Sequence, residues 1–230
     1  SKNNDFTKLA QNINKNFNNN QKDLITKWKS IKVTSLTSLK STLDQLNHKF
    51  DLWRGESDVN DLIPDMIEDL KDKNKISLDD GAYVSSLKTD PKILITKSDG
   101  SYLYLTTDLA TVINRKSQNF DTVLYVVDKR QSLHFNQLFQ CVEYFGIDNA
   151  DFQHIAFGTV NDSLGNPFKT RDGGTKKLID LFEETKCYVK DINKNLDDST
   201  INKLANTILT FSDLITNRKT DYKLCRCRHS

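Results

Sequence analysis

The chain of 230 residues is long enough to bury one good hydrophobic core or two small ones. It is 37% hydrophobic and 28% charged, and its mean hydropathy of −0.59 is that of a protein poor in core. The net charge of +2 argues against a purely electrostatic nucleic-acid binder, although it leaves room for a local basic patch. Neither a membrane-length apolar run nor the apolar segment of a secretory signal is found, so we expect a cytoplasmic protein with no membrane partner.

Helices are expected in the first fifty residues. Leu9, Ile13 and Phe17 recur at a helical spacing within an Asn- and Lys-rich stretch that otherwise favours a solvated chain end. Two helices are expected between residues 23 and 49. The second carries a stripe of leucines, which indicates a packing face and implies no chemistry: Leu36, Leu39, Leu43 and Leu46.

A short strand over residues 50–55 is expected to lead into a helix. Asn60 or Asp61 can cap that helix, because their side chains accept hydrogen bonds from first-turn amides, and Pro64 is tolerated in its first turn. Its inward-facing residues would be Ile63, Met66, Ile67 and Leu70.

Residues 76–90 have loop character, with a turn signal at residues 79–81. Alternation in residues 92–97 and 101–105 predicts a β-hairpin. The hairpin leads into a helix that a hydroxyl or carboxylate within residues 106–108 can cap.

The centre of the chain predicts a strand–helix–strand unit. Residues 123–128 and 152–157 are short apolar runs, and an amphipathic helix over residues 133–145 separates them. A connection of this length between two such strands implies a right-handed parallel crossover. Ligands in open parallel sheets bind beyond the carboxyl ends of the strands. The polar residues 128–131 and 158–174, which follow the two runs, therefore predict a small-molecule site.

Two further helices are expected towards the end of the chain. Thr175 can cap the first, with inward residues Leu178, Leu181, Phe182 and Val189. Ser199 can cap the second, with inward residues Ile201, Leu204, Ala205, Ile208 and Phe211.

The four cysteines are scattered. Cys141 falls on the apolar face of an expected helix and Cys187 near the end of another, as inert thiols of an intracellular protein often do. Cys225, Cys227 and His229 could in principle hold a metal. Three potential ligands within five residues at a chain terminus are a frequent chance pattern, so we predict no metal site.

Several motifs in register resemble the catalytic domain of arginyl-tRNA synthetases. They lie in residues 98–110, 126–131 with His134 and Gln137, 154–158 and 167–175, and residues 50–57, 211–214, 217–218 and 220–222 fit the same family in the same order. The resemblance runs from about Leu24 to Tyr222. The agreement of separate motifs makes it far more specific than any one of them.

The resemblance implies an α/β fold, namely part of a Rossmann-like class I synthetase catalytic domain with parallel strands and helices, plus a helical and β-hairpin insertion. Residues 1–50 would belong to the insertion, 51–190 to the second half of the catalytic core, and 191–223 to a helical segment leading to an anticodon-binding domain. Residues 224–230 form an atypical tail. The implied reaction joins L-arginine to ATP as arginyl-adenylate and then passes the arginyl group to tRNA-Arg. Mg²⁺ is expected with ATP, and the parent enzyme is expected to be a monomer.

By the same resemblance, four residues surround the arginine substrate: Glu56, Tyr104, Asp108 and Gln131. A guanidinium is a planar, permanently charged fork, and carboxylates that accept two hydrogen bonds at once recognise it best. Glu56 and Asp108 could grip it from two sides, with Tyr104 over the methylenes and Gln131 offering a donor and an acceptor. The alternatives are that Asp108 is only a helix cap and that Glu56 is a solvated loop charge.

Five residues are assigned to ATP on the same ground: His134, Gln137, His154, Phe157 and Gly158. His134 and Gln137 share a face near a helix start and could reach ATP, but they could equally form a polar helix face. His154 and Phe157 resemble the segment that borders adenine, where backbone groups make most of the contacts that recognise the base. Their side chains could therefore be purely structural.

Lys169 and Arg171 match the second class I signature in a degenerate form. Adenylate formation needs no protein nucleophile, because the arginine carboxylate attacks the α-phosphate directly. The protein positions the substrates and stabilises charge on the leaving pyrophosphate. Two cations on a loop flanked by glycines suit that catalytic role. The alternative is a solvated basic turn.

The first class I signature, two histidines flanking an apolar residue and a glycine, does not occur in the sequence. In the family it would lie before residue 1, and the family pattern stops after Lys223. We therefore expect the later half of the catalytic domain of an arginine–tRNA ligase, a fragment that does not aminoacylate alone. A non-catalytic arginine- or nucleotide-binding remnant and another class I synthetase stay open as alternatives.

Overall fold

The computed structural model describes residues 5–10, 13, 21–161 and 177–223. The chain divides into two compact units, which we treat separately. The helical unit comprises Ser1–Asp51 and Lys176–Phe211, and the α/β unit comprises Leu52–Thr175 and Ser212–Ser230. Within the described residues, no helix is both long enough and apolar enough to cross a membrane.

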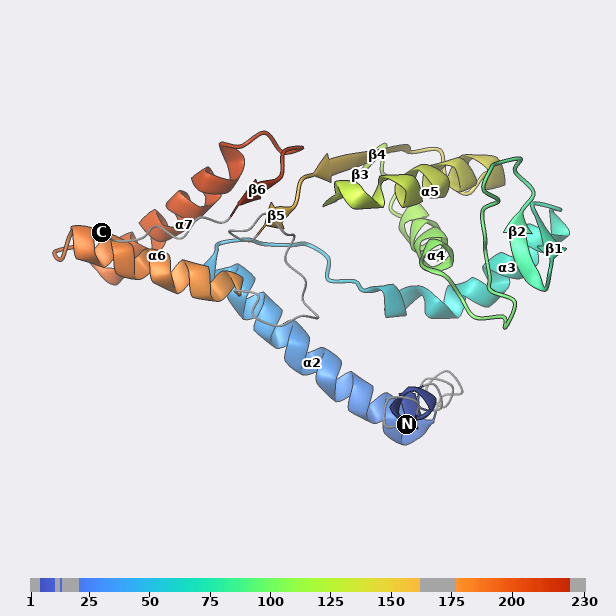
Figure 1. Cartoon of the computed structure of the whole chain (residues 1–230), viewed down its shortest axis with the longest axis horizontal. Coiled ribbons are helices and arrows are strands. Elements are labelled where there is room, and N and C mark those ends of the chain that lie inside the picture. The colour runs from blue at the N-terminus through green and yellow to red at the C-terminus, as the bar shows by residue number, and fades with distance from the viewer. Residues whose placement is uncertain (1–4, 11–12, 14–20, 162–176, 224–230) are drawn as a thin grey trace. The chain divides into compact units, whose positions relative to one another are not determined.

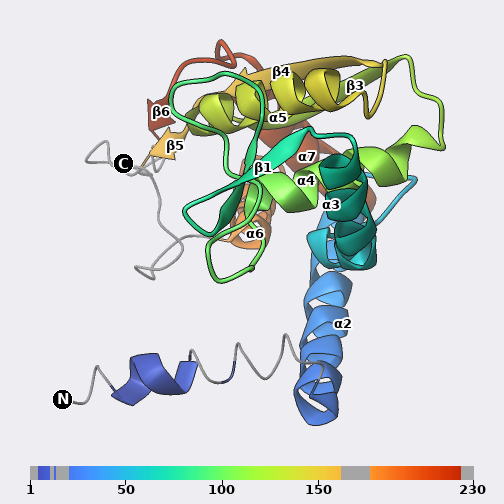
Figure 2. The same cartoon turned by 90° about the vertical axis from the view of Figure 1, so that its right-hand side faces the viewer.

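The α/β unit follows the order helix, hairpin, helix, strand, helix, strand (Figures 1 and 2). Its elements are the 3-10 helices η1 (Glu56–Leu62) and η2 (Lys129–Gln131), the α-helices α3 (Ile63–Asp72), α4 (Tyr104–Lys116) and α5 (Ser132–Phe145), and the strands β1 (Ile76–Asp79), β2 (Ala82–Ser85), β3 (Thr122–Asp128), β4 (Asp151–Phe157), β5 (Val160–Asn161) and β6 (Tyr222–Lys223). One hydrophobic core joins η1, α3, β1, α4 and α5. The predicted inward residues of α3 all belong to that core.

The predicted strand–helix–strand unit is confirmed. Strands β3 and β4 pair in parallel over seven residues, from Thr122 opposite Asp151 to Asp128 opposite Phe157. Helix α5 covers one face of the pair, where the ring of Tyr125 lies 5.0 Å from that of Phe135 (Figures 1 and 2). It ends at Gly146, whose φ of 67° is a left-handed conformation that glycine adopts without strain.

Local structure differs from expectation before α3. No strand forms over residues 50–55, because the side chain of Asp58 accepts a hydrogen bond from the amide of Gly55 at 2.9 Å and turns the chain into η1. The predicted caps Asn60 and Asp61 are also wrong. They lie inside η1, which continues directly into α3.

The expected loop over residues 76–90 is a β-hairpin instead. Strands β1 and β2 flank the correctly predicted turn, in which Asp80 and Gly81 have φ values of 45° and 79°. Residues 92–97 pair mainly with β2, since the amide of Ser85 donates to the carbonyl of Ile93 at 2.8 Å. The hairpin expected over residues 92–105 is reduced to an isolated antiparallel bridge between Thr96 and Tyr102.

Helix α4 begins earlier than expected, at Tyr104. Its N-cap is Leu103, whose amide donates to the hydroxyl of Thr106 at 3.3 Å. That hydroxyl also donates to the carbonyl of Ile95. Asp108 therefore lies inside the helix, and the alternative that it is only a cap is wrong.

The helical unit contains α2 (Lys22–Gln45), α6 (Leu178–Ile192) and α7 (Asp198–Leu214), the last of which ends in the α/β unit. Residues 23–45 form one helix rather than the start of two, since neither glycine nor proline interrupts them. Leu46, which follows α2, is buried against Phe182 and Ala205, and its carbonyl accepts a hydrogen bond from Asn206 at 2.7 Å.

The last two helices bury fewer residues than the periodicity predicts. Phe182, Val189, Ile201 and Ala205 are buried, whereas the other predicted inward residues are only partly buried or exposed. Thr175, the expected cap of α6, lies outside the described residues. Asp197 replaces Ser199 as the cap of α7, because its carboxylate accepts from the amide of Thr200 at 2.9 Å.

Candidate functional site

Strands β3 and β4 end side by side, at the edge where the sequence predicts a small-molecule site. Asp128 ends β3 and lies opposite Phe157, which ends β4. The carboxylate of Asp128 accepts hydrogen bonds from the backbone and guanidinium of Arg130, at distances of 2.6–3.0 Å. These bonds, mainly those of the guanidinium, lower the pKa of Asp128, so this end of the sheet carries a fixed ion pair.

The N-terminal halves of α4 and α5 meet near this edge through one short contact between side chains. Asp108 Oδ2 lies 2.7 Å from Nε2 of His134, and the two side chains are 29% and 25% exposed. Tyr104 precedes Asp108 by one helical turn and is 76% exposed. Gln131, also exposed, precedes His134 by three residues. We call these four residues the α4–α5 cluster. It holds three of the four residues predicted to surround arginine.

Glu56 is the fourth, and the structure places it at the exposed start of η1. Helix η1 packs against α4, and Arg54 just before it donates a hydrogen bond to the side chain of Asn114 on α4. Glu56 and Asp108 thus belong to neighbouring elements of one core. A shared grip on a guanidinium stays a prediction.

The residues predicted to bind ATP lie on two sides of the β3–β4 pair. His154 faces α5, where its ring lies 4.8 Å from that of Phe135 and its Nε2 donates to the carbonyl of Val127 at 3.1 Å. This contact supports the structural alternative for its side chain. His134 pairs with Asp108, and Gln137 follows on α5, half-buried.

The opposite face of the strand pair borders a cavity of about 640 Å³. Of the five predicted ATP residues, Phe157 and Gly158 line it within the described structure. Its wall also includes Val126 of β3, and Asp128 and Arg130 contribute charge at the strand end. A cavity of this size is within the usual range for a small-molecule ligand.

Residues 217–222, which we call the strap, close one side of this cavity. Gly158 donates from its amide to the carbonyl of Arg218 at 2.6 Å, and the Arg218 guanidinium donates to the carbonyl of Ala156 at 2.6 Å. Asp221 Oδ1 accepts from the amide of Thr159 at 2.7 Å and lies 2.9 Å from Nζ of Lys129. The strap therefore fixes the ends of both β3 and β4.

Asp221 is charged over a wide pH range. The Thr159 amide, followed by Lys129, lowers the pKa of its carboxyl to about 2. Sequence reasoning assigned no role to Asp221. Its motif, residues 220–222, was part of the family pattern, but the partners of Asp221 lie 62 and 92 residues away in the chain.

Gly158 is the position where the strap leaves no room for a side chain. A Cβ there would lie 2.6 Å from the carbonyl carbon of Thr220, closer still to its oxygen, and 2.9 Å from the amide nitrogen of Asp221. These are backbone atoms, which cannot rotate out of the way. The close approach of two chain segments explains glycine at this position.

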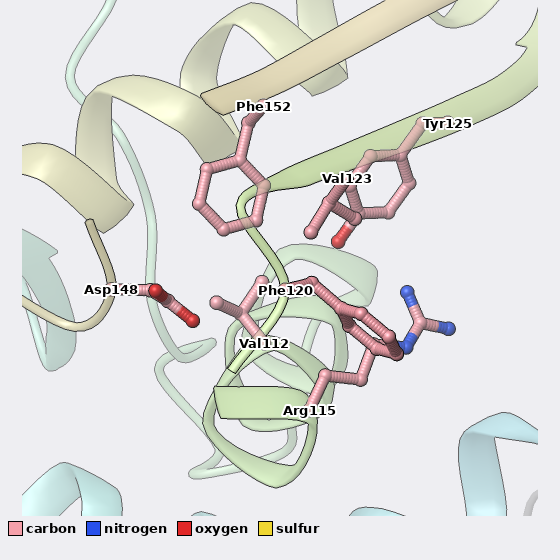
Figure 3. Close-up of a pocket in the computed structure, with 7 residues that line it drawn as sticks. All are labelled: Val112, Arg115, Phe120, Val123, Tyr125, Asp148 and Phe152. Atoms are coloured by element: carbon pink, nitrogen blue, oxygen red, sulfur yellow. The ribbon is translucent and has the colours of Figure 1, made fainter. Parts of the chain in front are cut away.

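A second pocket, of about 10 Å³, is too small for a substrate (Figure 3). Val112, Phe120 and Phe152 surround it, and the guanidinium carbon of Arg115 lies 5.8 Å from the centroid of the Tyr125 ring. Burial raises the pKa of Tyr125. This pocket is part of the packing between α4 and β3.

Two predicted groups lie outside the described residues: the candidate catalytic residues Lys169 and Arg171, and the tail with Cys225, Cys227 and His229. In the part of the chain that the structure describes, no group of three or more His, Cys, Asp or Glu residues could hold a metal ion.

Comparison with known proteins gives a consistent result. Residues 1–225 match the family model for "tRNA synthetases class I (R), catalytic domain". An arginine–tRNA ligase of Francisella tularensis subsp. tularensis (strain SCHU S4) is 43% identical over 201 residues, which are 85% of this chain and 35% of that protein. The corresponding ligase of Agathobacter rectalis is 39% identical over 210 residues, covering 82% and 35%. The chain thus spans about a third of the length of these relatives.

Solved structures agree at the level of the fold. The arginyl-tRNA synthetase of Plasmodium falciparum has a TM-score of 0.77 at 23% identity, covering 95% of this chain and 39% of that one. The arginyl-tRNA synthetase of Thermus thermophilus has a TM-score of 0.66 at 16% identity, covering 91% and 45%. The predicted α/β fold, with parallel strands and helices of a class I catalytic domain, is confirmed.

Proposed function

The chain belongs to the family of class I arginyl-tRNA synthetase catalytic domains, and from this premise we propose that it supplies the arginine pocket and part of the ATP site of an arginine–tRNA ligase. The whole enzyme would join L-arginine to ATP and pass the arginyl group to tRNA-Arg. In the first step an oxygen of the arginine carboxylate bonds to the α-phosphorus and pyrophosphate leaves. The chain's own contribution is to hold the substrates in line and to stabilise charge.

The observation that carries this proposal is the contact between Asp108 and His134. Because His134 occupies Oδ2 at 2.7 Å, the carboxylate is held in one orientation and its remaining lone pairs can accept from a guanidinium. Tyr104 lies one turn away and can cover the methylenes, while Gln131 can bond to polar groups of the substrate. Glu56 is proposed as the second carboxylate.

The ATP part of the proposal has less direct support. Phe157 and Gly158 line the cavity beyond β4 and are proposed to border adenine. His134 and Gln137 are proposed to reach ATP from the first turns of α5, whose positive end favours anionic groups. His154 is proposed to support this edge through its packing. Lys169 and Arg171 are proposed to stabilise the leaving pyrophosphate.

Mg²⁺ would accompany the phosphates of ATP and screen their charge. The described residues hold no cluster of carboxylates that fits it, so we assign it no protein ligand and route no step through it. We also propose that the parent enzyme is a monomer and is located in the cytoplasm. Cell fractionation and size-exclusion chromatography of the parent test those two points.

Calorimetry with L-arginine tests the pocket directly. We expect Asp108→Asn to weaken binding by about 10- to 150-fold, since a hydrogen bond to a charged group contributes about 1.5–3 kcal/mol. The matched control is Asp72→Asn, which removes the same charge from an exposed position at the end of α3. Equal arginine affinity in Asp108→Asn and the unaltered chain would contradict the proposal.

The alternatives have distinct outcomes in the same experiment. No heat with arginine in any variant indicates an inert remnant, and preference for lysine or cysteine indicates another class I synthetase. Arginine binding that Asp108→Asn weakens by about 10- to 150-fold, without aminoacylation by the 230-residue chain, is the result that we expect. The sequence contains no first class I signature, so charging of tRNA by this chain alone would overturn our assignment of residues.

A further inference from the structure

Helix α2 differs from the other helices in its charge. It contains five lysines and two aspartates, a net charge of +3, whereas α3 and α6 are acidic, with net charges of −3 and −2. Among α3 to α7, no helix exceeds a net charge of +1. Among the helices α2 to α7, α2 therefore carries the largest positive charge.

The lysines of α2 also gather on one side of the helix. At 3.6 residues per turn, four of the five fall within an arc of about 80°. These four, which we call the lysine face, are Lys22, Lys29, Lys32 and Lys40. Asp23 and Asp44 both lie outside the arc. Lys22, Lys29 and Lys40 are exposed and lie within about 20° of one line, which extends about 27 Å along the helix.

An aromatic ring borders the lysine face. The ammonium of Lys32 lies 5.1 Å from the centroid of the half-buried Trp28 ring. The remaining surface of α2 is rich in Ser and Thr, and the hydroxyls of Thr26, Thr34 and Thr42 donate to carbonyls one turn earlier. A line of cations beside neutral hydroxyls and an aromatic edge matches a polyanion with a regular spacing of charge.

We propose that the lysine face of α2 binds the phosphate backbone of tRNA. This inference rests on the proposed function, which makes tRNA the polyanionic substrate of the parent enzyme. Helix α2 has no buried residue along its length, and on the lysine face Lys22, Lys29 and Lys40 are exposed beside the half-buried Leu36. Lysines that contact phosphates release condensed counterions, and binding then depends steeply on salt.

An RNA partner fits better than a membrane surface. An interfacial helix needs a wide, strongly apolar face opposite its charges. In α2, Lys32 interrupts the apolar side, and Leu36 and Leu43, which belong to that side, are already half-buried. Anionic vesicles therefore form a separate arm of the test rather than a second proposal.

The experiment measures binding of a fluorescent tRNA-Arg transcript to the full 230-residue chain over a range of salt concentrations. The variant carries Lys22→Gln, Lys29→Gln and Lys40→Gln, which preserve helix propensity. We expect the slope of log affinity against log salt to fall by about 3, and affinity at 0.1 M salt to fall by roughly a hundredfold or more. The corresponding triple Lys→Arg variant keeps the charges and should keep the binding.

The matched control removes three exposed lysines of the α/β unit: Lys88, Lys97 and Lys116. The proposal is overturned if the two Lys→Gln triples weaken binding equally, if the α2 triple has no effect, or if the unaltered chain binds phosphatidylserine vesicles and not tRNA. Circular dichroism verifies that each variant is folded. Arginine calorimetry on the α2 triple should be unchanged, so a failure of the lysine face and a failure of the arginine pocket are separately visible.

Discussion

Replacing Gly158 with alanine tests the strap most directly. The added Cβ would lie 2.6 Å from a carbonyl carbon and 2.9 Å from an amide nitrogen, both in the backbone of the strap. Overpacking costs about 1–3 kcal/mol, and a clash with backbone atoms belongs in the upper part of that range. Alanine also reduces the conformational entropy of the unfolded chain, which offsets about 0.4–1 kcal/mol of this destabilisation. We therefore expect the strap to be destabilised by about 1–2.5 kcal/mol, a roughly 5- to 70-fold increase in its open fraction.

Amide hydrogen exchange measures this opening locally. The amides of Thr159 and Tyr222 donate across the strap, so both should exchange about 5- to 70-fold faster in Gly158→Ala, while amides in the core of α5 keep their rates. Gly55→Ala is the matched control, because a Cβ at Gly55 meets no atom within 4 Å. Unchanged exchange in Gly158→Ala, or the same acceleration in Gly55→Ala, would refute the reasoning.

Two further predictions concern titration and reactivity. The carboxyl of Asp221 has a pKa lowered to about 2, so the stabilisation from its contacts is complete above pH 4 and is lost as the pH falls towards 2. A carbon-13 carboxyl titration with a midpoint near the ordinary 3.8 would contradict this. Burial raises the pKa of the Cys141 thiol to about 11, so a thiol reagent at neutral pH should modify the exposed Cys187 and spare Cys141 in the folded chain. Peptide mass spectrometry distinguishes the two, and equal labelling would show that Cys141 is accessible.

The sequence predicted those parts of the fold that local patterns decide. Strands β3 and β4 were found because each is a compact apolar run, and the end of α5 because Gly146 follows the last periodic residue. The turn at Asp80 and Gly81 was recognised as well. The strands that flank this turn were not predicted, because each is only four residues long. Strand β2 also pairs with residues 92–97, and tertiary packing rather than local sequence determines which segment a strand pairs with.

In the candidate site, too, local motifs pointed to individual residues but not to the contacts between distant segments. Tyr104, Asp108 and Gln131 are proposed from motifs, and the structure adds the contact between Asp108 and His134, which are 26 residues apart. The helix start was placed too late: Leu103 is the N-cap, and Thr106, one of the expected cap residues, lies inside the first turn and accepts from the Leu103 amide. The bonds of Asp221 to Thr159 and Lys129 join segments 62 and 92 residues apart, so no local pattern could reveal them.

The packing of helix α5 matters for any attempt to change the amino-acid specificity of the proposed pocket. The buried side of α5 packs in the hydrophobic core through Phe135, Leu138 and Cys141. On the adjoining side of the helix, His134 contacts Asp108 and orients its carboxylate. A change in the volume of any of these buried side chains would shift the helix and tilt the imidazole with it. Libraries for redesigned specificity should therefore vary the underside of α5 together with the positions that touch the ligand.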